Sequence, residues 1–203
     1  MPPLPHCAVL FERFFLPWHS EHSTKSRVYE ATFPDMIEDR SLAASPANWP
    51  RRLTDEGERE SLRRIEVMTS AAHSDYAQQF GLAGDMGLTW IRTVDQYYDC
   101  AKIQAMIDGS DPADFSNDYV ILCCEFGAAL GHVLKQRMPR LGWFTDWPYW
   151  DSWLADPATG IAIPPFHWAI KKMSECGVRD GFAEKVEACL QAIEDRRAEI
   201  DAS

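Results

Sequence analysis

The longest apolar stretch of the chain covers residues 119–134 and is interrupted only by Glu125 and His132. A helix that is apolar on every side is buried on every side, so this stretch predicts the central helix of the core. We expect the helix to begin near Asn117, a good N-cap residue, and to end before Pro139.

Four further stretches repeat apolar residues at helical spacing, namely 55–80, 91–108, a helix opening at Pro165 and one starting at Asp180. The first of these is the longest, and Gly81 is placed to end it. Its apolar stripe consists of Leu62, Ile65, Met68, Ala72 and Tyr76. The chain is therefore expected to contain about five helices.

After Gly142 the period of the pattern changes to two, which is typical of β-strands. Strands are predicted over residues 143–147, 152–155 and 161–163, and residues 156–160 have the composition of a tight turn. The prediction is an α+β fold, in which the helices pack around the central apolar helix and a small antiparallel sheet forms in the C-terminal half.

The first 53 residues have no clear period beyond an apolar run at 7–16, which is expected to form a short strand or helix. We interpret residues 1–53 as an extension that wraps a single α+β domain at 54–203. Three histidines and one cysteine in the extension have a spacing that fits no standard metal site, so no metal is expected there; they are His6, Cys7, His19 and His22.

Composition narrows the choice of partners. The chain has 31 acidic and 20 basic residues, a formal net charge of -11, and no basic run, so nucleic acid and anionic membranes are not expected as partners. A basic partner protein is compatible with this charge. No stretch has the ~18 apolar residues of a membrane span, and no signal peptide is expected.

The six cysteines lack C-x-x-C spacing, and Cys123 and Cys124 are adjacent within a predicted helix. Because neighbouring helical residues point to different faces, this arrangement favours reduced cysteines and a bacterial, cytoplasmic protein. No motif for a nucleotide, a metal or another cofactor occurs, so none is expected.

Glu125 and His132 are the sharpest candidates for chemistry. They are seven residues apart, nearly on one helical face, where a carboxylate and an imidazole can act as base and acid. The alternative is structural, in which each side chain finds a hydrogen-bond partner of its own because an unpaired buried polar group is costly.

The predicted hairpin is dense in aromatic residues. Trp147, Tyr149 and Trp150 flank Pro148, and His167 is expected near the same rim. Exposed, these residues would form a surface typical of protein interfaces. Covered by the N-terminal extension, they would be core, as Trp143 and Trp153 are expected to be.

Asp95 and Asp99 lie one turn apart on the helix predicted at 91–108. A carboxylate pair at this spacing can bind a cation, but solvated surface is the commoner arrangement.

One ordered set of motifs resembles a bacterial domain family. It comprises Ile103-Gln104 with Asp108, Gly127 and Gly131 in a helix, Trp143 before a hairpin, Pro164 or Pro165, and Ile170 to Met173. The set is similar to an uncharacterised α+β family of unknown function and covers roughly residues 54–176. The resemblance implies a helical layer against a small sheet and no catalytic residues. The extension, the last helix and the tryptophan-dense hairpin depart from the family pattern.

Two functions follow as expectations. The first is a non-catalytic protein-interaction module that uses the aromatic rim and an acidic surface, as an immunity or accessory protein that neutralises a partner would. The alternative is a small-molecule-binding or hydrolytic enzyme with Glu125 and His132 in a cleft between the central helix and the sheet. The balance of the sequence favours the non-enzymatic function and does not fix the oligomeric state.

Overall fold

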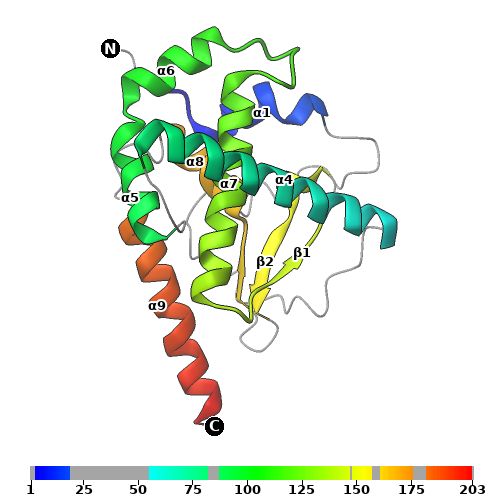
Figure 1. Ribbon diagram of the computed structural model, residues 1–203, viewed down its shortest axis with the longest axis vertical. Coiled ribbons are helices and arrows are strands. Elements are labelled where there is room, and N and C mark those ends of the chain that lie inside the picture. The colour runs from blue at the N-terminus through cyan, green and yellow to red at the C-terminus, as the bar shows by residue number, and fades with distance from the viewer. Residues whose placement is uncertain are drawn as a thin grey trace.

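A computed structural model describes residues 3–18, 55–81, 87–146, 148–156, 161–175 and 182–202. In this part of the chain there are seven α-helices and a three-stranded sheet, which is the predicted α+β fold (Figure 1). The helices are α1 (Cys7–Phe14), α4 (Asp55–Phe80), α5 (Leu88–Tyr97), α6 (Cys100–Gly109), α7 (Asp118–Arg137), α8 (Pro165–Lys172) and α9 (Phe182–Asp201).

Helix α7 is the predicted central helix. Its N-cap Asn117 accepts a hydrogen bond from the Val120 backbone N–H at 2.9 Å, and its C-cap is Met138, before Pro139. Fourteen of its twenty residues are buried, on all sides of the helix. The uniform apolarity of residues 119–134 is thus explained by packing against α4, α6 and α8.

Helix α4 has the predicted bounds and crosses α7 (Figure 1). Ile65, Ala72 and Tyr76 of its apolar stripe are buried, whereas Leu62 and Met68 are partly exposed. Gly81 follows the helix with φ +64°, a left-handed conformation that glycine adopts at little cost.

The prediction of one helix at 91–108 is wrong, because the structure has two helices there, α5 and α6. Helix α5 ends at Tyr97, and Asp99 then caps α6 by accepting a hydrogen bond from the Lys102 backbone N–H at 2.9 Å. A short acidic side chain at an N-cap satisfies a backbone donor that would otherwise be free at the start of a helix. Apolar period alone does not reveal this break.

The sheet is antiparallel, in the order β1-β2-β3, with β1 at Gly142–Phe144, β2 at Trp153–Asp156 and β3 at Ile161–Ile163. Trp143 pairs with Leu154, and Leu154 pairs with Ile163. A 3₁₀ turn, η3 (Tyr149–Asp151), separates β1 from β2. Residues 157–160 of the predicted turn lie outside the described residues.

Two glycines of α7 allow neighbouring elements to approach closely. A Cβ on Gly127 would lie 2.7 Å from the Cα of Phe166 in α8, and one on Gly131 would lie 2.5 Å from Cζ2 of Trp143 in β1. Both distances are shorter than any real contact. This close packing offsets the roughly 1 kcal/mol that each glycine costs a helix relative to alanine.

The apolar run near the N-terminus forms α1, a helix rather than a strand, and its residues belong to the core. Leu10, Phe11, Phe14 and Phe15 are buried in the same cluster as α7 and α8. Residues 3–18 therefore pack into the domain. The rest of the proposed extension, residues 19–53, lies outside the described residues.

The described cysteines are free, and no helix in the described part of the chain is long and apolar enough to cross a membrane. The five described cysteines are Cys7, Cys100, Cys123, Cys124 and Cys189. Four of them are buried, which agrees with reduced cysteines in a core.

Candidate functional site

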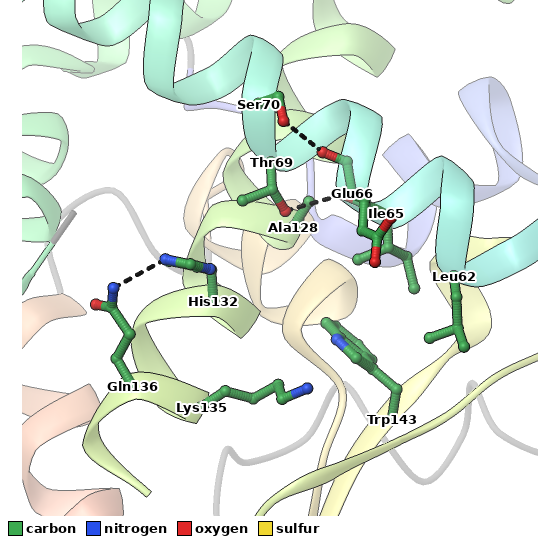
Figure 2. Close-up of a pocket in the computed structure, with 10 residues that line it drawn as sticks. All are labelled: Leu62, Ile65, Glu66, Thr69, Ser70, Ala128, His132, Lys135, Gln136 and Trp143. Carbon is green, nitrogen blue, oxygen red and sulfur yellow. Dashed lines mark hydrogen bonds between the residues drawn. The ribbon is translucent and has the colours of Figure 1, made fainter. Parts of the chain in front are cut away.

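A groove of about 790 Å³ opens between α4, α7 and β1 (Figure 2). This size lies within the range of sites that hold small molecules. Helix α4 forms one wall, α7 the other, and the strand closes the side. The groove is lined by Leu62, Ile65, Glu66, Thr69, Ser70, Ala128, His132, Lys135, Gln136 and Trp143.

The floor of the groove is apolar. Ile65 and Ala128 are buried, and the Trp143 indole lies partly exposed beside them. The edge of this indole rests on the bare backbone of Gly131, so the ring is held by packing rather than by a hydrogen bond. We expected Trp143 to be core; it packs on the core and also presents a surface to the groove.

Polar groups surround this floor. His132 Nε2 lies 2.9 Å from Nε2 of Gln136 on the next turn of α7. With the amide nitrogen as donor, Nε2 accepts and the ring proton is on Nδ1. The ammonium of Lys135 extends into the groove from the same helix, and the carboxylate of Glu66 faces it from α4 (Figure 2).

The two hydroxyls of the groove are engaged elsewhere. Thr69 donates to the Ile65 carbonyl at 2.8 Å, and Ser70 donates to the Glu66 carbonyl at 2.9 Å. A hydrolytic nucleophile would instead donate to a nearby base such as His132. Neither hydroxyl is therefore directed at His132 in this structure.

Glu125 and His132 do not form the predicted pair. Seven residues of helix separate them by about 10 Å along the axis, and only His132 lines the groove. Glu125 lies nearer the N-terminal end of α7 than His132 does, and it is close to Asp75 of α4. The helical-face argument placed the two side chains in one direction but did not account for this separation along the axis.

Glu125 is 8% exposed, in a corner that it shares with the Asp75 carboxylate of α4. Burial, and secondarily the Asp75 carboxylate, raises the pKa of Glu125 to about 7. The same corner contains two tyrosine hydroxyls, and burial raises the pKa of Tyr76 above its ordinary value and that of Tyr98 to about 12. Near neutral pH a large share of Glu125 is protonated, so this residue avoids an unpaired buried charge.

The predicted aromatic rim is wrong for the residues the structure describes. Tyr149 and Trp150 are 4% and 3% exposed, because Phe166 packs on the first and Phe15 with Phe115 on the second. The covering alternative holds for Trp150, since Phe15 belongs to the N-terminal segment. Trp147 lies outside the described residues.

His167 is also buried rather than on a rim, with 1% of its surface exposed. Its Nε2 lies 3.3 Å from the Asp151 carboxylate, which is itself buried. Phe11 and Trp153 pack against the imidazole ring. The His167–Asp151 pair therefore joins α8 to η3 and is closed to a ligand.

Asp99 is exposed, as expected of a solvated surface residue, whereas Asp95 is partly buried. Asp95 pairs with the fully buried ammonium of Lys172 and accepts a hydrogen bond from the Phe182 backbone N–H at 3.1 Å. It thereby joins α5, α8 and α9, while Asp99 caps α6. Within the described residues no cluster of three or more histidine, cysteine or acidic side chains can hold a metal. His19 and His22 are outside that part.

A thiol nucleophile is not favoured in the core. Burial raises the pKa of Cys124 to about 12, and the Tyr149 hydroxyl that contacts it only partly opposes this effect. A thiol of this pKa is uncharged at neutral pH, and the thiolate is the reactive form.

Sequence reasoning missed most of the groove. Lys135 and Glu66 both line it, and neither was a candidate from the sequence. One signal was available: His132 and Lys135 are three residues apart, on the side of α7 that also carries Gly131 near Trp143. The crossing of α4 over α7, which creates the opposite wall, has no such local signal.

Comparisons of the chain with protein-family models, with curated proteins and with solved structures gave no match. The resemblance to an uncharacterised bacterial family stays a prediction.

Proposed function

We propose that this protein is a non-enzymatic binding protein and that it holds a small molecule in the groove between α4, α7 and β1. The observation that carries the proposal is the groove itself, of about 790 Å³, with an apolar floor and polar groups on both walls. Ligand sites commonly combine a largely apolar lining with a few placed polar groups.

Binding is favoured over hydrolysis by the state of the polar side chains. His132 is engaged with Gln136, and the Thr69 and Ser70 hydroxyls donate to their own helix. Glu125, the other half of the expected acid–base pair, does not line the groove.

The test is a pair of single-tryptophan additions on α4. Thr69→Trp places an indole in the groove, whereas Val67→Trp adds the same group at a position that is 47% exposed and does not line the groove. Fragments such as indole, 2-phenylethanol and phenylacetate are titrated by ¹H–¹⁵N NMR. We expect shifts at Ala128, His132 and Trp143 in the wild type and the Val67→Trp variant, and none in Thr69→Trp. Binding of no fragment, or equal binding by both variants, contradicts the proposal.

A protein partner is the second candidate. The net charge of -11 favours a basic partner, and Val9, Leu16 and Trp18 are large apolar residues with more than a third of their surface exposed. This idea would be tested by measuring how the affinity for a captured partner changes with salt concentration. Two variants of the partner that lack basic surface residues should bind more weakly and with a smaller dependence on salt. The burial of Tyr149 and Trp150 removes the aromatic rim on which this function was first expected to rest.

A further inference from the structure

We propose that the ligand of the groove is a small organic acid, with a carboxylate that meets Lys135 and His132 and an aromatic or aliphatic body that lies on Trp143. This inference rests on the proposed function and specifies its ligand class. It is carried by the charge and placement of four groups in the groove.

Lys135 supplies the first argument. Its side chain is partly buried in the groove, and among the described residues no carboxylate forms an ion pair with it. The ammonium points across the groove rather than along its own helix (Figure 2). A partly desolvated cation without a counterion gains from an anionic ligand group, because a charge-assisted hydrogen bond is about twice as strong as a neutral one.

His132 supplies a second donor. Its Nε2 is engaged with Gln136, so the proton on Nδ1 is available, and this second ring nitrogen faces the groove (Figure 2). His132 and Lys135 are three residues apart on one face of α7. Both line the groove from the same helix, so in this proposal they share the ligand carboxylate.

Trp143 and Glu66 fix the orientation. The indole, held on Gly131, gives the ligand body an apolar surface next to the donors. The Glu66 carboxylate on the opposite wall repels a second anion, so the ligand carboxylate is directed towards α7. The protein's net charge of -11 repels anions in general. Selection of an anionic ligand in the groove therefore depends on the positive charge of Lys135.

The test compares three probes of nearly equal shape, phenylacetate, 2-phenylethanol and phenethylamine, by NMR titration of the full chain. We expect phenylacetate to bind about ten- to a hundredfold more tightly than the alcohol, as a hydrogen bond to a charged group implies. Lys135→Met keeps the aliphatic stem and removes the charge, and it should abolish this preference while alcohol binding stays. Arg140→Met, an exposed position outside the groove, is the matched control and should keep the preference.

Each result separates the two proposals. Equal affinity for acid and alcohol, tighter binding of the amine, or an unchanged preference in Lys135→Met overturns the organic-acid inference while the groove remains a binding site. Binding of none of the three probes by the wild type rejects the proposed function, and the inference with it.

Discussion

At the scale of single residues, the most consequential polar contact is the buried pair of Lys172 and Asp95. Lys172 has no exposed surface, and its partner also accepts the Phe182 N–H at the start of α9. Removing one member of a buried ion pair leaves the other charge without compensation, which typically costs about 3–5 kcal/mol.

We therefore expect Asp95→Ala to lower the free energy of unfolding by about 3–5 kcal/mol, measured by urea denaturation. Asp99→Ala, four residues away, should cost only about 1 kcal/mol because it removes an N-cap. Equal losses for the two variants would show that the Lys172 ammonium reaches solvent when its partner is removed.

Glu125 gives a prediction for pH. Its pKa in the folded chain is about 7, raised from the ordinary value of 4.5, so the folded state binds a proton that the unfolded state has released between these values. The contribution of Glu125 to stability is full below about pH 4.5 and is lost as the pH rises to about 7. Asp75 is the titratable group that acts on its pKa, and Glu125 in turn helps to raise the pKa of Tyr76 and of Tyr98.

Glu125→Gln keeps the shape and removes the titration. Relative to the wild type, the variant should gain about 1–3 kcal/mol of stability between pH 5 and pH 8, followed by chemical denaturation at several pH values. Glu56→Gln, at an exposed site on α4, should show no such trend. A difference that is constant with pH would place the Glu125 carboxyl in a more solvated setting.

These residues also show where sequence reasoning ends. Asn117 and Gly81 were assigned their roles correctly because caps and turns depend on local chemistry. Asp95 was misjudged because its partner is 77 positions away, at Lys172. A local pattern contains no information about such a partner.

At the scale of elements, the packing of α7 on α8 is set by Gly127. A Cβ at this position would meet not only the ring of Phe166 but also its Cα, at 2.7 Å, and backbone cannot rotate away. The two helices would have to separate.

Gly127→Ala should therefore lower Tm, by an amount that corresponds to about 1–3 kcal/mol, despite the better helix propensity of alanine. Gly109→Ala is the control, because a Cβ there meets nothing within 4 Å, and it should be neutral or slightly stabilising. Differential scanning fluorimetry is sufficient for the comparison. A stable Gly127→Ala variant would mean that α8 shifts without cost.

The type of most elements was predictable from the sequence, and the site was not. Periods of 3.6 and two located α4, α7, α8 and the three strands, because each element buries one face or all faces. The groove depends on α4 crossing α7 beside β1, three elements distant in sequence. Of the candidates from sequence, only His132 lies in it.

At the scale of the whole molecule, the excess of 11 negative charges acts against compactness. The described surface ion pairs, among them Arg63 with Glu60 and Arg196 with Glu199, are exposed and contribute little each. Self-repulsion is the larger of the two effects, and it is screened by salt within about 10 Å at 0.1 M.

Raising NaCl from about 0.02 to 0.5 M should consequently increase Tm by a few degrees, measured in a buffer at constant pH. Chloride and fluoride salts should act alike if screening is the cause. A fall in Tm would instead indicate that the surface ion pairs outweigh the net charge.

The position of α1 has a consequence for how the chain acquires its structure. The Glu175 backbone N–H donates to the Pro5 carbonyl at 3.1 Å, and Phe14 packs on Tyr119 at a ring separation of 5.0 Å. Contacts this distant in sequence are slow to form, because a long loop must close first. During synthesis α1 leaves the ribosome before α7 and α8 do. Until those helices are made, Leu10, Phe11 and Phe14 have no core to pack against. The nascent chain thus passes through an interval in which the apolar side of α1 is a target for chaperones.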